Sequence, residues 1–182
     1  RELEESGDNN SILLADERTG IWLAELMSNE IQGTQLASLR RAIDLDFNEG
    51  RSQLAVASLR EGIFVYDVIT DASSTTSSLQ LIQTYGQNPF GEKVEHVNWI
   101  NDELIVATEW DGDALFISNQ NGQFEFIGRN RSRIRDDSIA DVQVIDSNMF
   151  QFYRDGEIRK YDLTDVIDFT IPSADHSNWV IF

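Results

Sequence analysis

The chain has 182 residues, of which 41% are hydrophobic and 25% charged, so it can form one domain with a substantial core. Its 32 acidic and 14 basic residues give a net charge of −18. Such a charge repels phosphate backbones, excludes general nucleic-acid binding, and favours cationic partners or a cation such as Ca²⁺. There is no cysteine and no apolar run near the ~18 residues of a membrane span. Disulfides, thiolate metal sites, a cysteine nucleophile and a membrane-spanning helix are therefore excluded, and the composition is compatible with the cytosol, the periplasm or the exterior.

The first element of the chain begins after a polar start. Residues 1–10, RELEESGDNN, are too polar for a strand and are interpreted as an acidic N-terminal extension. From Ser11, SILLADERTGIWLAEL combines an apolar run, a polar turn that ends in glycine, and a second apolar run. Residues 18–31 also fit a short helix, but the alternation of Ile21 and Leu23 favours a strand.

This strand–turn–strand pattern returns three times. It appears in QLAVASLREGIFVYDVIT from Gln53, in ELIVATEWDGDALFIS from Glu103 and in NMFQFYRDGEIRKYDL from Asn148. The first strands of the four hairpins are predicted at 12–16, 53–58, 103–108 and 148–153. The turn glycines, which allow the positive φ of a tight hairpin, are Gly20, Gly62, Gly112 and Gly156.

Short alternating strands flank the hairpins. They precede three of them, as AIDLDF from Ala42, EHVNWI from Glu95 and ADVQVI from Ala140, and they follow all four, as TQLAS, SLQLIQTY, QFEFIG and IDFTIP. Four-stranded antiparallel units with a period near 45 residues predict an all-β fold, a β-propeller of about four blades. We place the blades at approximately 11–40, 41–86, 93–130 and 138–172.

The C-terminal segment predicts an extra strand at 177–182. Its sequence DHSNWVIF resembles VEHVNWI at 94–100, because both place Asn before Trp and then apolar residues. Two interpretations remain open. The strand pairs with residues 12–15 and closes a four-bladed ring, or the chain belongs to a larger propeller.

The hairpin LAVASLREGIFVYDV resembles that of WD40 repeats. Tyr66-Asp67 and Tyr161-Asp162 stand where that family has Trp-Asp, and Asp111-Gly112 and Asp155-Gly156 match its turn. No unit begins with Gly-His and none contains Trp-Asp, so the hydrogen-bond network of the family cannot be built. The resemblance implies a WD40-like propeller and a protein-binding scaffold.

A second resemblance concerns the strands alone. The chain is similar to acidic, calcium-dependent β-propeller phytases in the order of its strands, which are LLADERTGIWL, AIDLDF and LAVASLREGIFVYDV. No catalytic motif of that family can be matched. It implies, as an alternative function, an extracellular calcium-dependent phosphohydrolase, or an incomplete propeller domain that accompanies one.

Two groups of residues are candidate ligand sites. The basic run GRNRSRIR would place its arginines on one side of an extended segment, a pattern that suits phosphate, carboxylate or an acidic peptide. His96 lies on a predicted inner strand, where it would face a central channel. The candidate ligand-binding residues are Arg129, Arg131, Arg133, Arg135 and His96.

The turn EWDGD is the candidate metal site. Its alternating carboxylates, Glu109, Asp111 and Asp113, suit Ca²⁺, which prefers oxygen ligands. The alternative interpretation is that these residues form a solvated turn that binds no metal. No nucleophile elbow, phosphate loop or zinc signature occurs. The sequence therefore favours a noncatalytic scaffold that binds a protein partner. We expect this scaffold to hold either no cofactor or Ca²⁺, and to bind neither nucleic acid nor membrane.

Overall fold

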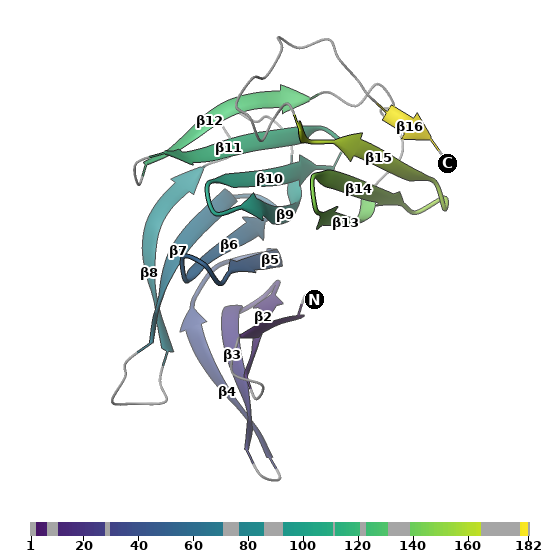
Figure 1. The fold of residues 1–182 in the computed structure, drawn as a ribbon. Coiled ribbons are helices and arrows are strands. Elements are labelled where there is room, and N and C mark those ends of the chain that lie inside the picture. Colours follow the sequence, from purple (N-terminus) through teal and green to yellow (C-terminus); the bar gives the residue numbers. More distant parts are fainter. Residues whose placement is uncertain are drawn as a thin grey trace. The chain divides into compact units, whose positions relative to one another are not determined.

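The computed structural model describes residues 3–6, 11–27, 30–70, 77–85, 93–110, 112–120, 123–130, 139–164 and 179–181. These residues form sixteen strands in four antiparallel sheets of four strands (Figure 1). In each sheet the neighbours follow the order of the chain, so each sheet is a meander. Within this described part, no helix is long and apolar enough to cross a membrane.

The first two sheets belong to a compact unit of residues 1–95. Sheet 1 contains β1 (Leu3–Ser6), β2 (Ser11–Asp16), β3 (Gly20–Met27) and β4 (Glu30–Ala37). Sheet 2 contains β5 (Ala42–Asn48), β6 (Gln53–Ser58), β7 (Gly62–Thr70) and β8 (Ser77–Tyr85). The two sheets bury a shared cluster that includes Leu13 and Ile21 of sheet 1 and Leu54 and Tyr66 of sheet 2.

The other two sheets form a second compact unit, residues 96–182, with the first residues of β9 assigned to the unit before it. Sheet 3 contains β9 (Val94–Asn101), β10 (Leu104–Glu109), β11 (Ala114–Gln120) and β12 (Gln123–Asn130). Sheet 4 contains β13 (Ile139–Ile145), β14 (Asn148–Tyr153), β15 (Ile158–Asp162) and β16 (Trp179–Ile181). Val106 and Phe116 of sheet 3 share a buried cluster with Met149 and Tyr161 of sheet 4.

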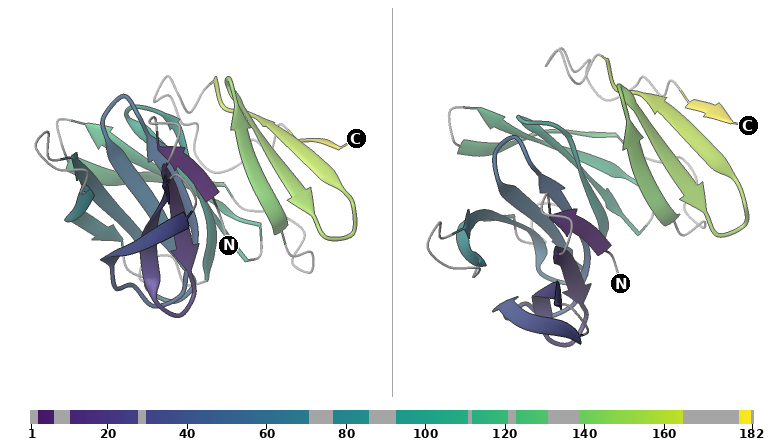
Figure 2. Two further views of the ribbon diagram at one scale, coloured as in Figure 1. Left: turned by 90° about the horizontal axis from the view of Figure 1, so that it is seen from below. Right: turned by 60° about the horizontal axis from the view of Figure 1, so that its bottom comes forward.

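The predicted hairpins are confirmed to within one residue. β2, β6, β10 and β14 are the four predicted first strands, and residues 20–27 form a strand rather than a helix. The burial of β6 and β10 on both faces agrees with their continuous apolar sequences. Figure 2 shows the twist that each meander acquires from its strands. The predicted strand IDFTIP lies outside the described residues.

Both ends of the chain differ from the prediction. The polar segment Leu3–Ser6 forms β1 and pairs with β2, so residues 1–10 do supply a first strand to sheet 1. The C-terminal strand β16 pairs with β15. The predicted pairing of this strand with residues 12–15 is therefore wrong, because β1 already occupies that edge of β2.

The four turn glycines have the backbone conformation that the sequence predicts. Their φ angles are 110° at Gly20, 95° at Gly62, 86° at Gly112 and 95° at Gly156. The surroundings of two of them differ. A Cβ at Gly20 would overlap the Ala37 carbonyl oxygen and lie 2.5 Å from the backbone nitrogen of Leu39, whereas a Cβ at Gly156 would meet no atom within 4 Å.

This difference predicts unequal effects of the same substitution. Gly156→Ala should cost about 1–2 kcal/mol, the strain of a positive φ alone. Gly20→Ala should cost at least about 3 kcal/mol, because the backbone after β4 must also move. Urea unfolding of the two variants measures both costs. Equal losses would show that steric overlap at Gly20 contributes nothing.

Candidate functional site

Two predicted sites come together around Arg129. The backbone nitrogen of Glu109 donates to the Asp113 carbonyl oxygen at 2.8 Å, so the β10–β11 turn places these residues opposite each other. Arg129 lies on β12 opposite Leu115 of β11, next to that turn. Its Nη2 lies 2.6 Å from Glu109 Oε2 and 2.6 Å from Asp113 Oδ2, and its Nε donates to the same Asp113 oxygen at 2.7 Å.

Burial makes this ion pair a structural contact of sheet 3. The exposed fraction of the side chain is 0% for Glu109, 6% for Asp113 and 25% for Arg129. Carboxylates without water need a compensating charge, and the guanidinium supplies it to both. Two of the three carboxylates that the sequence offers to Ca²⁺, those of Glu109 and Asp113, are thus engaged by an arginine that the sequence offers to an anion.

Of the remaining candidate residues, the structure describes only His96. Arg131, Arg133, Arg135 and Asp111 lie outside the described residues, and their roles stay predictions. His96 lies on β9, half-buried, between the buried residues Val94 and Val97. Among the residues that the structure describes, no group of three or more His, Asp or Glu side chains is placed to hold a metal ion.

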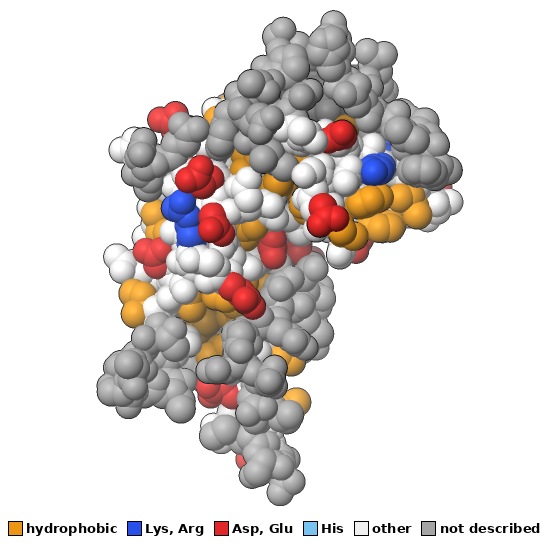
Figure 3. Space-filling model, viewed as in Figure 1, with side chains coloured by type: hydrophobic (Ala, Val, Ile, Leu, Met, Phe, Trp, Pro, Cys, Tyr) orange, Lys and Arg blue, Asp and Glu red, His pale blue; other side chains and the backbone are white. Residues whose placement is uncertain are grey.

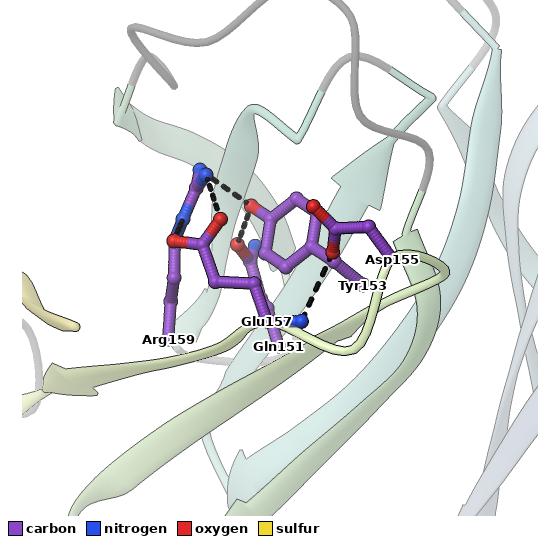
Figure 4. A network of polar contacts seen from close by, with 5 residues as sticks. All are labelled: Gln151, Tyr153, Asp155, Glu157 and Arg159. Atoms are coloured by element: carbon purple, nitrogen blue, oxygen red, sulfur yellow. Dashed lines mark hydrogen bonds and ion pairs between the residues drawn. The ribbon is translucent and has the colours of Figure 1, made fainter. Parts of the chain in front are cut away.

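A second polar network, in sheet 4, was not predicted from the sequence (Figure 4). Arg159 of β15 donates from Nε and Nη2 to the two carboxylate oxygens of Glu157, at 2.7 and 2.9 Å. Its Nη1 donates to the Tyr153 hydroxyl at 3.1 Å, and that hydroxyl donates to Gln151 Oε1 at 2.8 Å. The Arg159 guanidinium also lies 4.2 Å from the centre of the Tyr153 ring, a cation–π contact.

The two networks meet between sheets 3 and 4. Gln151 Nε2 donates to the Gly112 carbonyl oxygen at 3.4 Å, which links β14 to the β10–β11 turn. Burial raises the pKa of Tyr161, and Asp113 contributes to this increase. The β10–β11 turn of sheet 3 thus contacts β14 of sheet 4.

Hydrogen bonds shift the pKa values of three carboxylates. The Arg159 guanidinium lowers the pKa of Glu157, and Glu157 in turn raises the pKa of Arg159. The Thr19 side chain lowers the pKa of Asp16, and the Thr164 side chain lowers that of Asp162. Since these groups are bound to partners within their own turns and sheets, their shifts reflect local structure and not an acid–base site.

A weak signal for the second network exists in the sequence. Gln151 and Tyr153 alternate along β14, and Glu157 and Arg159 are likewise two residues apart, so each pair shares a side of its segment. Polar residues at these alternating positions indicate a buried polar group on that face. The contact of Arg129 with Glu109 and Asp113 has no such signal in the sequence. This contact depends on the register of β11 and β12 and on the bulge between Phe116 and Ile117.

No protein-family model and no curated protein matches this sequence. The fold is similar to that of the computationally designed protein Ika8, at 15% identity and a TM-score of 0.60, over 88% of this chain and 45% of Ika8. It is also similar to Sqt1 of Saccharomyces cerevisiae, at 12% identity and a TM-score of 0.53, over 67% of this chain and 31% of Sqt1. The chain spans less than half of either protein. These similarities and the antiparallel sheets are consistent with a propeller-like all-β fold.

Removal of the Arg129 side chain should destabilise the second unit. Arg129→Met removes the guanidinium that compensates the buried carboxylate of Glu109. We expect a loss of about 2 kcal/mol, less than the ~3–5 kcal/mol of a fully buried pair because water reaches part of Arg129. Adding Glu109→Gln to this variant should recover part of the loss. Arg154→Met, at an exposed turn position, is the control, and equal unfolding free energies for both arginine variants would contradict the assignment.

Stability should also depend on pH through Glu157. Its lowered folded pKa means that its ion pair contributes stability above the pKa of the unfolded carboxyl, about 4, and that this stability is lost as pH falls through the folded pKa. Glu157→Gln should therefore lower the melting temperature at neutral pH and have less effect near pH 3. Glu125→Gln, at an exposed position of β12, is the matched control. A Glu157→Gln effect that is the same at every pH would contradict the ion-pair assignment.

Proposed function

We propose that the chain forms consecutive blades of a β-propeller and acts as a noncatalytic scaffold that binds another protein through the turns at the ends of its blades. The supporting observation is the repetition of four sheets with the same strand order. Similarity to Sqt1 supports the same class of fold. Repeated sheets leave their connecting turns exposed in series, and such series of turns form extended binding surfaces.

The charged side chains of the candidate site support a structural role. Arg129 joins Glu109 and Asp113, while Arg159 joins Glu157. A calcium-dependent phosphohydrolase would use the proposed metal ligands Glu109, Asp111 and Asp113. Because Arg129 already engages two of them, Glu109 and Asp113, the geometry favours the scaffold over the enzyme.

Matched triple variants can test whether the partner binds through the turns at one end of the sheets or at the other. One variant, Glu49→Gln with Asp102→Asn and Asp146→Asn, changes exposed turns before the first hairpin strands. The other, Glu17→Gln with Glu61→Gln and Asp155→Asn, changes exposed turns after them. Each removes three negative charges with little change in shape.

The experiment uses a binding protein identified by crosslinking to the wild-type chain and then purified. Calorimetry should show that one triple variant weakens binding by at least about tenfold, about 1.4 kcal/mol, and that the other does not. Unchanged affinity in both variants would refute binding through the turns. Calcium-dependent release of phosphate from a phosphomonoester by the wild-type chain, lost in Glu109→Gln, would instead favour the enzyme.

A further inference from the structure

The strand β8 forms one edge of sheet 2 and is the longest edge strand that the structure describes. It has nine residues and pairs with β7 on one side. Among the described residues, no strand pairs with its other side. Figure 1 shows β8 at the margin of its sheet. The backbone N–H and C=O groups on that side can therefore pair with an added strand.

β8 also lacks the features that protect an edge strand from a further strand. Natural edge strands carry charged residues, proline or bulges for this purpose. Apart from the three-residue β16, every other edge strand of the four sheets has at least one charged residue, whereas β8 has none and contains no proline. Its bulge leaves out Ile82, so residues 77–81 pair in one unbroken register with residues 66–70. That length is typical of a whole strand.

The two faces of residues 77–81 differ in character. Leu79 and Leu81 lie on the face that sheet 2 turns toward the cluster it shares with sheet 1, and Leu79 packs against that cluster. Leu81 is nevertheless 50% exposed. On the opposite face, Gln80 is exposed and pairs with Asp67 of β7. An added strand would therefore meet apolar side chains on one face and polar side chains on the other.

The strands around this edge carry only negative charge. The third and fourth strands of sheets 1 and 2 contain Glu25, Glu30 and Asp67 but no lysine or arginine. Figure 3 shows acidic side chains spread over the described surface in view. Neighbouring strands lie about 4.8 Å apart, so an added strand would lie about 10 Å from the backbone of Asp67. A cationic side chain on that strand is attracted to this carboxylate, because the separation does not exceed the Debye length of about 10 Å at 0.1 M salt.

We infer that the edge of β8 binds an extended segment of another protein as a fifth strand of sheet 2. Backbone pairing along residues 77–81 would supply the hydrogen bonds. The segment would alternate aliphatic residues, which pack beside Leu79 and Leu81, with lysine or arginine on the face of Gln80. Charge favours such a segment over a second copy of this chain, because each copy carries −18.

This inference goes beyond the proposed function, because it concerns the side of a sheet and not the turns at its ends. Residues 77–81 lie within β8, whereas the two triple variants described above change residues of turns. Binding at β8 and binding through the turns are therefore weakened by different variants. Either proposal can fail while the other holds.

The experiment uses a synthetic peptide of about seven residues that alternates valine with lysine. Calorimetry with the full chain should show that the peptide binds at micromolar to hundreds of micromolar concentration. Leu81→Lys should weaken this binding at least about tenfold, since it replaces an apolar contact with a like charge. Ile31→Lys, at a position of the edge strand β4 that is 74% exposed, is the matched control. It makes the same change of charge and should alter the affinity less than about twofold.

A second peptide tests whether the backbone makes the contact. It has the same sequence with every backbone nitrogen methylated, which keeps the side chains and their charge but removes the N–H donors. We expect it to bind at least about tenfold more weakly. Circular dichroism establishes that both variants of the chain fold. Equal affinity for the two peptides would overturn the inference, as would equal effects of the two lysine substitutions or no binding of the first peptide at hundreds of micromolar.

Discussion

The packing of one apolar sheet face on the next is the constraint on which the rest of this structure depends. A four-stranded meander satisfies its inner backbone groups but cannot bury both of its faces. Sheets 1 and 2 bury Leu13 against Leu54 in one cluster, and sheets 3 and 4 bury Val106 with Met149 in another. Each repeat therefore needs a neighbouring sheet to bury its apolar face.

Polar groups in this apolar packing occur where the turns come together. Arg129 compensates the carboxylates of one turn, and Arg159 compensates Glu157 beside the equivalent turn of the next sheet. The arginine comes from a fourth strand in one case and from a third strand in the other. Arginines on strands at different positions in their sheets thus make the same kind of contact with carboxylates near a turn. In both networks an arginine pairs with carboxylates of its own sheet, and Gln151 connects the second network to the β10–β11 turn.

The sequence predicts the hairpins well because alternation and turn glycines are local signals. It predicts the ends of the chain badly for the same reason. Residues 3–6 lack an apolar pattern, yet their backbone pairs with β2, and pairing through the backbone needs no particular side chain. The likeness of the C-terminal segment to 94–100 carries no information on which strand it joins, and β15 is its partner. The contact of Arg129 with Glu109 requires a strand register that only the folded sheet shows.

The most direct test of this account is a nuclear Overhauser experiment on the chain with labelled methyl groups. It predicts contacts between methyl groups of sheets 1 and 2, among them those of Leu13, Ile21 and Val56, and between methyl groups of Val106 in sheet 3 and Met149 in sheet 4. These contacts should disappear together when each unit unfolds. Strong contacts within each sheet without any between neighbouring sheets would contradict the account, because the sheets would then fold without the packing on which it depends.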